Sequence, residues 1–433
     1  MEKQKIRILV ITSMPWRNDN NIGNSYSNIF SGLEHKIEFA HIYCRSGMPQ
    51  NNLCHKYFQI TEKDIISNIR NRNYLLGRAF YLDNPNENTK EEFSNIYNHM
   101  RILRWELFFL GRNILWNLSE WKNKRFTKFI EDFSPDIIFG TLTYMPNINK
   151  MMIYLKETYN IPLVVYSWDD VYSLKQFSLS PFFWLRRFEQ RKWIRKCVEK
   201  SDKMYVITRL MQKEYDKCFK KSSSLLYKGY SYKNELYQSR SINIPIQFVF
   251  MGNLGAGRWK TLVKFVKTLT EINKTGIKAI LKIYTLSPLT RQMRNKLTVK
   301  GISNIMPNVP NEKVMDVLKS ADILIHVEPI NLKDKLFYRL SFTTKLVDYF
   351  KAGRCILGLG GKTASLMYLE DYDCGIVIYD ISKMSQTVKY LIEHPDIIQE
   401  YAKKAWDCGY KNHQIENIQA NLYRDFVKLV PQN

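Results

Sequence analysis

The sequence has few of the features that mark secreted, metal-binding or membrane-spanning proteins. Its seven cysteines are scattered and form no Cys-x-x-Cys pair, which argues against a disulfide framework and a zinc site. No window of about 18 residues is apolar and uncharged, so no bilayer-spanning helix is predicted. The start, MEKQKIRILVITSMPW, has only a short apolar segment, which favours a first β-strand over a signal peptide. We therefore expect a cytoplasmic protein without a metal centre.

Signature motifs of several large enzyme classes are also missing. The histidines include no His-Glu-x-x-His and no Gly-x-Ser-x-Gly occurs, so zinc proteolysis and serine hydrolysis lack support. GLGGKTAS resembles a P-loop, but the first glycine of that motif would fall at Ile356, which excludes this NTPase site. DYD at 371–373 lies near the C-terminus and is interpreted as a turn.

The chain does contain many apolar residues and an excess of basic ones. With 433 residues and 45% hydrophobic content it can bury the cores of two or three domains. Lysine and arginine number 65 against 41 acidic residues, a net charge of +24. That charge favours anionic partners such as nucleotides, nucleic acid or an acidic membrane surface, without choosing among them.

Short apolar runs alternate with longer helical patterns in two series. The first series, up to about residue 212, comprises IRILVIT, IEFAHIY, PDIIFGTL, IPLVVYS and KMYVIT. A polar, turn-rich segment near 225–245 separates it from IQFVFMGN, KAILKIYT, SNIMPNV, ADILIHVEP, CILGLG and CGIVIYD. Such alternation predicts an α/β fold with two doubly wound, Rossmann-like domains, at 1–225 and 240–433. Ligands bind at the carboxyl ends of parallel strands, so the site is expected in a cleft where the domains face each other.

The segment FTTKLVDYFKAGRCIL predicts a short helix followed by a strand. Thr343 or Thr344 can cap the helix, and Gly353 can close it in a left-handed conformation. Leu346 and Phe350, four residues apart, form its core face.

Lys345 and Asp348 lie on a different face of this predicted helix, near its N-terminus. There the lysine could neutralise a diphosphate while the carboxylate accepts hydrogen bonds from ribose hydroxyls. The alternative, which spacing alone favours, is a surface Lys–Asp pair that contributes a few tenths of a kcal/mol.

A second segment, FVFMGNLGAGRWKTL, predicts a strand that runs through a glycine-rich turn into a helix. Gly252, Asn253, Gly255 and Gly257 would let the backbone approach a ligand closely, and Arg258 could grip a diphosphate through two hydrogen bonds. Alone this pattern is weak, since any strand-to-helix turn can need glycine.

Together these segments resemble the GT-B glycosyltransferases, in particular the retaining "group 1" type that builds bacterial capsule, O-antigen and exopolysaccharide. The C-terminal pattern of that family is matched by FVFMGNLGAGR, SADILIHVEP and FTTKLVDYFKAGRCIL. IRILVITSMP, SPDIIFGTL, IPLVVYSWDDVYS and KCVEKSDKMYVITRLMQKEY carry a looser resemblance in the N-terminal half.

The resemblance implies a sugar donor of the UDP or GDP type, bound without a cofactor. The residues it assigns to donor binding are Gly252, Asn253, Gly255, Arg258, Glu328, Thr344, Lys345 and Asp348. Arg258 and Lys345 would stabilise the departing diphosphate electrostatically, without an obligatory metal. Many retaining members carry two glutamates separated by seven residues, but the position eight before Asp348 is Leu340. Glu328 is a candidate replacement for the first glutamate.

Two further segments bear on the acceptor. In YSWDDVYS, Asp169 or Asp170 could orient or deprotonate an acceptor hydroxyl, although capping the next helix suits them equally. In SPFFWLRRFEQRKWIRK, Arg187, Arg191 and Arg195 share one helical stripe among aromatic residues. Such a stripe could lie on anionic lipid; the alternative is buried aromatics with solvated arginines.

The sequence therefore predicts a glycosyltransferase that moves a sugar from a nucleotide-diphosphate sugar to a surface-glycan acceptor. The resemblance implies a lipid-linked acceptor, which would place the enzyme peripherally at the inner membrane face. A C-terminal helix would pack back on the N-terminal domain. One alternative is a sugar-nucleotide epimerase of related fold, which would react with donor alone. Another is a basic nucleic-acid-binding protein, for which no recognition motif occurs, so no nucleic-acid partner is expected.

Overall fold

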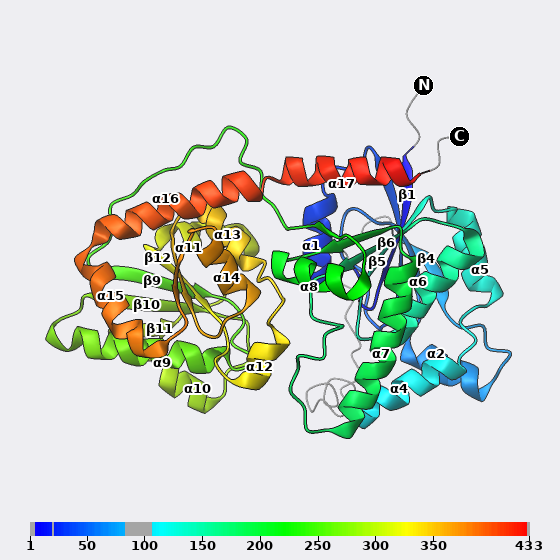
Figure 1. The fold of residues 1–433 in the computed structure, drawn as a ribbon, viewed down its shortest axis with the longest axis horizontal. Coiled ribbons are helices and arrows are strands. Elements are labelled where there is room, and N and C mark those ends of the chain that lie inside the picture. Colours follow the sequence, from blue (N-terminus) through cyan, green and yellow to red (C-terminus); the bar gives the residue numbers. More distant parts are fainter. Residues whose placement is uncertain (1–4, 20, 83–105, 431–433) are drawn as a thin grey trace. The chain divides into compact units, whose positions relative to one another are not determined.

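The computed structural model describes residues 5–19, 21–82 and 106–430, and the chain divides into two compact units. Unit 1 comprises residues 1–174, 178–227 and 416–433, and unit 2 comprises 175–177 and 228–415. Each unit is built around its own sheet, with helices packed on it (Figure 1).

The sheet of unit 1 has eight strands in the order β4-β3-β2-β1-β5-β6-β7-β8. They are β1 (Ile6–Thr12), β2 (Ile37–Tyr43), β3 (Lys56–Gln59), β4 (Arg78–Tyr81), β5 (Ile137–Thr141), β6 (Leu163–Ser167), β7 (Lys203–Val206) and β8 (Ser224–Leu225). All neighbours are parallel except β3 and β4. The five apolar runs predicted as strands are strands. The other three were not predicted: β8 has only two residues, β4 is largely exposed, and two of the four residues of β3, Lys56 and Gln59, are polar.

Helices cover both faces of this sheet, because neighbouring residues of a strand point to opposite sides. Phe139 of β5 meets Phe426 of the C-terminal helix edge to face, whereas a Cβ on the next residue, Gly140, would collide with Met152 of α6. The helices around this sheet are α1 (Asn21–Phe30), α2 (Glu62–Arg70), α4 (Glu106–Leu118), α5 (Lys124–Phe133), α6 (Pro146–Tyr159), α7 (Pro181–Lys200), α8 (Arg209–Phe219) and α17 (Ile415–Leu429). Within the described residues, no helix combines the length and apolarity needed to cross a bilayer.

The sheet of unit 2 has six strands, all parallel, in the order β11-β10-β9-β12-β13-β14. They are β9 (Ile246–Met251), β10 (Ala279–Tyr284), β11 (Ser303–Ile305), β12 (Ile323–Val327), β13 (Cys355–Leu359) and β14 (Ile376–Ile378). All six were predicted, and the α/β class is confirmed. The chain order reverses between β9 and β12. In open α/β sheets a crevice for ligands forms at the carboxyl ends of the two strands beside such a reversal.

The helices of unit 2 pack on a core of aliphatic and aromatic side chains, in which Phe248 of β9 meets Phe265 of α9 edge to face at 5.2 Å. They are α9 (Arg258–Ile272), α10 (Arg291–Leu297), α11 (Val314–Ser320), α12 (Leu332–Phe337), α13 (Lys345–Ala352), α14 (Ala364–Asp371), α15 (Met384–Glu393) and α16 (Pro395–Asn412), with 3₁₀ turns η1 (Asn273–Thr275), η2 (Asn311–Lys313) and η3 (Ile381–Lys383).

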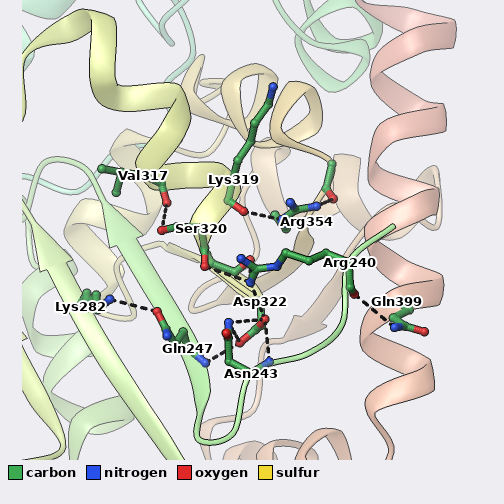
Figure 2. Close-up of polar contacts among 12 residues, drawn as sticks. Arg240, Asn243, Gln247, Lys282, Val317, Lys319, Ser320, Asp322, Arg354 and Gln399 are labelled. Carbon is green, nitrogen blue, oxygen red and sulfur yellow. Dashed lines mark hydrogen bonds and ion pairs between the residues drawn. The ribbon is translucent and has the colours of Figure 1, made fainter. Parts of the chain in front are cut away.

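The amino end of β12 is closed by Asp322, the residue directly before the strand (Figure 2). Its carboxylate accepts hydrogen bonds from Arg240 Nη2 at 2.8 Å, Asn243 Nδ2 at 2.9 Å and the backbone nitrogen of Gln247 at 2.8 Å. The Asp322 residue is 2% exposed. These bonds tie the segment that leads into β9 to the neighbouring strand, so Asp322 holds the sheet together at this end.

Candidate active site

Helix α13 begins at the carboxyl ends of β9 and β12. The Tyr349 hydroxyl, on its second turn, lies 3.2 Å from the carbonyl oxygens of both Met251 and Ile325 and can donate to one of them at a time. Leu346 and Phe350 are fully buried and Gly353 ends the helix with a φ of 60°, which confirms the predicted core face and left-handed cap.

The predicted threonine cap of α13 is wrong. Thr344 has helical φ and ψ angles, −58° and −21°, and its side chain makes no capping hydrogen bond. A side-chain cap needs an extended residue at that position. The Thr343 hydroxyl instead lies 3.4 Å from Glu328 Oε1, and its backbone nitrogen donates to Ser365 Oγ at 2.9 Å. Thr343 therefore contacts Glu328 of the site, and neither threonine caps the helix through its side chain.

Lys345, the first residue of α13, lies against the glycine loop. Its Cδ is 3.8 Å from the place where a Cβ on Gly252 would stand. Lys345 is half-buried, and its ammonium group makes no hydrogen bond or ion pair within the described part of the chain. Burial lowers the pKa of Lys345, and the charge of Lys228 adds to this while that of Asp348 opposes it. A partly desolvated cation without a counter-ion is suited to binding an anion.

Asp348 is paired with a lysine, but not with Lys345. Its Oδ1 accepts hydrogen bonds from Lys228 Nζ at 2.7 Å and from the Tyr230 hydroxyl at 2.8 Å. The Asp348 residue is 9% exposed, so a solvated surface Lys345–Asp348 pair is wrong. Oδ2 has no hydrogen-bond partner among the described residues and remains available to a ligand.

The glycine-rich turn between β9 and α9 is held in a tight conformation. The backbone nitrogen of Gly255 donates to Asn253 Oδ1 at 2.6 Å. Gly257 has a φ of 78°, and a Cβ there would stand 2.5 Å from Asn331 Nδ2. Glycine is therefore required at 257 both by conformation and by space. Through this turn Gly252 comes against Lys345, so the two segments singled out in the sequence meet in space.

Arg258, the first residue of α9, is held in place by Glu328, the residue after β12. Arg258 Nη2 lies 3.3 Å from Glu328 Oε2, and its guanidinium group lies 4.3 Å from the centre of the Tyr338 ring. The Glu328 Oε1 accepts from His326 Nε2 at 3.0 Å. Burial alone would raise the pKa of Glu328, but His326 and Arg258 outweigh it and lower the pKa. Glu328 is thus a buried carboxylate that orients Arg258.

Sequence reasoning missed four side chains of this cluster. They are Lys228, Tyr230, His326 and Tyr338, two of which lie in the polar segment interpreted as a linker. Leu340, where many relatives of the resembled family carry a glutamate, is fully buried and offers no polar group. Within the described residues, no group of three or more His, Cys, Asp or Glu is placed to hold a metal ion.

Asp169 and Asp170 belong to unit 1. Asp170 is fully buried, accepts from the backbone nitrogen of Ser173 at 2.8 Å, and lies 3.6 Å from Arg187 Nη2. Asp169 is half-buried. Neither caps α7, because that helix begins at Pro181 with Ser180 as its capping residue.

The predicted lipid-facing arginine stripe is wrong, because its side chains point toward the loop that carries these aspartates. Arg187 is 1% exposed and donates to the Ser173 carbonyl at 2.6 Å. Arg191 lies 4.0 Å from the Tyr172 ring centre, and Arg195 donates to the Tyr172 hydroxyl at 2.6 Å. The three arginines hold residues 170–173 in place.

Solved structures that resemble the chain over nearly its full length share this architecture. Anabaena HepE in complex with UDP-glucose is 10% identical, with 98% of this chain and 100% of that chain covered and a TM-score of 0.58. An E. coli trehalose-6-phosphate protein bound with UDP-2-fluoro glucose is 10% identical, with the same coverage and a TM-score of 0.61. A glycosyltransferase from Rickettsia africae is 10% identical, covers 100% of both chains and has a TM-score of 0.60. The chain has the GT-B fold.

No protein-family model and no curated protein matches the chain by sequence. At identities near 10%, the likeness to these structures shows the fold and not the reaction.

Proposed function

We propose that the protein is a glycosyltransferase that takes a sugar from a nucleoside diphosphate sugar and transfers it to a glycan hydroxyl. The observation that carries the proposal is Lys345, a half-buried cation without a counter-ion at the start of α13, against Gly252. Structures of the same fold in complex with UDP-glucose or UDP-2-fluoro glucose support a donor of the UDP type; a GDP donor is the alternative.

In this proposal the donor diphosphate lies between Lys345 and Arg258. The backbone N–H groups of Thr344 and Lys345 have no partner among the described residues and would donate to the same phosphates. Gly252 leaves room for the ligand beside Lys345, and Asp348 Oδ2 would accept from the ribose hydroxyls. Glu328 would act by keeping Arg258 in place.

The transfer breaks the bond between the anomeric carbon and the diphosphate oxygen and forms a bond to the acceptor oxygen. Negative charge gathers on the departing diphosphate, where Lys345 and Arg258 would stabilise it, each contact contributing ~1.5–3 kcal/mol. The acceptor hydroxyl must lose its proton. Asp170 is fully buried and bonded to Ser173, which argues against it as the base for this step.

The acceptor in this proposal is a surface glycan carried on a lipid, with the enzyme peripheral to the inner face of a membrane. The net charge of +24 supports an anionic surface as partner.

Binding of nucleoside diphosphates to the full chain tests the proposal. We expect either UDP or GDP to raise the melting temperature, because a ligand that binds only the folded state stabilises it by mass action. Lys345→Ala should abolish that rise. The matched control is Lys319→Ala, an exposed lysine at the opposite end of β12 whose ammonium group points away from its neighbours (Figure 2). If neither nucleotide binds, or if both variants bind alike, the donor site is wrong.

A sugar-nucleotide epimerase remains a second candidate because His326 and Glu328 form a buried carboxylate–imidazole pair beside the site. Such a pair could move a proton to and from a sugar carbon or hydroxyl. Incubation of the protein with donor alone separates the two functions. An epimerase converts the sugar of the donor without an acceptor. A transferase leaves the donor intact or slowly hydrolyses it to free sugar and nucleoside diphosphate.

A further inference from the structure

The first half of helix α7 of unit 1, up to Gln190, has an inverted pattern, with polar residues inside and apolar residues outside, whereas the buried residues of its second half are apolar. Arg187 and Gln190 are each 1% exposed, whereas Phe182, Leu185 and Phe188 are 42%, 61% and 56% exposed. The three apolar residues are spaced three apart, so they share one side of the helix. An inward-facing arginine accounts for the buried side of this half of the helix but not for the exposed apolar row.

The row continues beyond the start of the helix with Leu179, which is 88% exposed. The backbone around Leu179 is fixed, because Ser180 Oγ accepts from the Phe183 nitrogen at 3.4 Å and Trp184 Nε1 donates to the Ser178 carbonyl at 3.0 Å. Leu179 is therefore presented to the outside by a capped helix start.

Farther along the same side the helix becomes basic. Lys192 and Lys196 follow Leu185 by seven and eleven residues, which keeps all three on one face of an α-helix. Both lysines are exposed and make no ion pair within the described part of the chain. Trp193 lies beside them, with its ring centre 5.0 Å from Lys196 Nζ and 4.4 Å from Lys150 Nζ.

We propose that this side of the helix docks unit 1 onto an anionic lipid bilayer. The α7 face is defined as Leu179, Phe182, Leu185, Phe188, Lys192 and Lys196. Its apolar end would enter the boundary between headgroups and acyl chains, while its lysines would contact anionic headgroups beside an interfacial tryptophan. A bilayer fits better than a protein partner, because a single row of four apolar side chains is small beside the roughly 800 Å² that each partner buries in a standard protein interface.

Docking through the α7 face would bring the enzyme to the membrane, where a lipid-linked acceptor lies. In that respect the inference rests on the proposed function. Docking itself needs neither donor nor acceptor, so a vesicle assay can fail while the nucleotide assay succeeds, and the reverse.

Sedimentation of the full chain with vesicles tests the docking. We expect binding to phosphatidylglycerol–phosphatidylcholine vesicles that weakens as salt rises, and little binding to phosphatidylcholine alone. The triple variant Phe182→Ser, Leu185→Ser and Phe188→Ser should lower partitioning more than tenfold. Lys192→Gln with Lys196→Gln should lower it about 25-fold, roughly fivefold for each lysine near an anionic surface.

Matched controls come from unit 2, where exposed residues of the same kinds lie outside any such face. Leu236→Ser with Leu286→Ser removes leucines that are 86% and 84% exposed, and Lys296→Gln with Lys300→Gln removes two exposed lysines. Both control variants should bind vesicles like the parent protein.

Three results would overturn the proposal. The parent protein could ignore anionic vesicles at low salt, or the α7 variants could bind as well as the controls. Light scattering could also reveal a dimer that the serine variant dissociates, which would assign the face to a second copy of the chain. Nucleotide binding by each variant, measured without vesicles, verifies that it is folded.

Discussion

Strand β12 carries a buried carboxylate at each end, and the two ends use it differently. At the amino end, Asp322 is surrounded by side-chain and backbone donors from residues 240–247, all of which belong to the scaffold. At the carboxyl end, Glu328 holds Arg258, whose side chain is 15% exposed and keeps other N–H donors. The carboxylate at the amino end is surrounded by donors of the scaffold, whereas the arginine bound at the carboxyl end keeps donors that are available to a ligand.

The difference shows how a ligand-binding site can be distinguished from a cluster on the same strand that only stabilises the fold. Both carboxylates bind an arginine that is 70 or more residues away in the chain, so long-range pairing alone is not a mark of function. What distinguishes the carboxyl end is Lys345, a partly buried cation whose ammonium group makes neither a hydrogen bond nor an ion pair within the described residues, whereas Arg354 at the amino end donates to the carbonyl oxygens of Lys319 and Gly353. Natural scaffolds rarely leave such a group unpaired without a use for it.

The largest effect on stability should come from removing Asp322 at the amino end of β12. Asp322→Ala leaves Arg240 without its partner and several buried donors unsatisfied, and we expect a loss of ~3–5 kcal/mol in the free energy of unfolding. Thermal unfolding of the full chain measures the loss. Nucleotide binding below the new melting temperature should persist, because Asp322 contacts no residue of the carboxyl end.

Asp316→Ala is the control, because Asp316 lies on the exposed side of α11 and makes no side-chain ion pair or hydrogen bond with the residues that the structure describes. It should change the unfolding free energy by less than about 0.5 kcal/mol. Equal stability of the Asp322 and Asp316 variants would mean that the hydrogen bonds of Asp322 do not stabilise the sheet.

Removing Arg258 at the carboxyl end should weaken ligand binding as well as folding, whereas removing Asp322 should affect folding alone. Arg258→Ala removes one charged donor, and we expect nucleoside diphosphate affinity to fall by ~1.5–3 kcal/mol, that is about 10- to 150-fold. The same change leaves Glu328 without its arginine and also destabilises the fold.

A double variant separates these two effects. Adding Glu328→Gln removes the buried carboxylate that has lost its arginine. It should therefore restore part of the lost stability without restoring affinity for the nucleoside diphosphate. If affinity recovered together with stability, Arg258 would act only through the fold, and its assignment to the diphosphate would be wrong. Titration calorimetry and thermal unfolding of the parent protein and of the two variants measure both quantities.

Much of unit 2 could be predicted from the sequence, because its strands are apolar on both faces and its turns carry glycine at positions such as Gly257 and Gly353. The partners of Asp348 could not, since Lys228 and Tyr230 are 120 and 118 residues distant and lie in a segment without periodicity. Similarly, the spacing of Arg187 and Arg191 places them on one side of a helix but does not say which side is buried.

A smaller loss of stability should follow from changing Gly353, which precedes β13 at the amino edge of the sheet. Its φ is 60°, and a Cβ there would stand 3.2 Å from Trp406 Cε3. Gly353→Val should therefore cost ~1–2 kcal/mol or more, because a β-branched residue is unfavourable in the left-handed region and the ring must shift. Gly111→Ala is the control, since a Cβ at Gly111 meets nothing within 4 Å. A melting temperature equal to that of the parent would contradict the strained cap.

The smallest predicted effect is the pH dependence of nucleotide affinity. It is also the effect most specific to Lys345. Burial lowers the pKa of Lys345, so the free protein loses this proton at a pH below the ordinary lysine value of about 10.4. A bound diphosphate favours the charged lysine, which means that affinity is full at neutral pH and falls as the pH rises through the lowered pKa. Arginine stays charged throughout this range.

Comparison of the parent protein with Lys345→Arg measures how much the loss of the Lys345 proton contributes to the pH dependence of affinity. Any titration of the nucleotide base is common to both proteins, so only the difference between their affinity–pH profiles reports on residue 345. We expect the parent profile to fall at lower pH than that of Lys345→Arg, whereas Lys319→Arg, at the opposite end of β12, should leave the parent profile unchanged. Parallel profiles for the parent and Lys345→Arg would mean that the lysine is not the cation facing the phosphates. The ammonium group without a partner at the carboxyl end would then need another explanation.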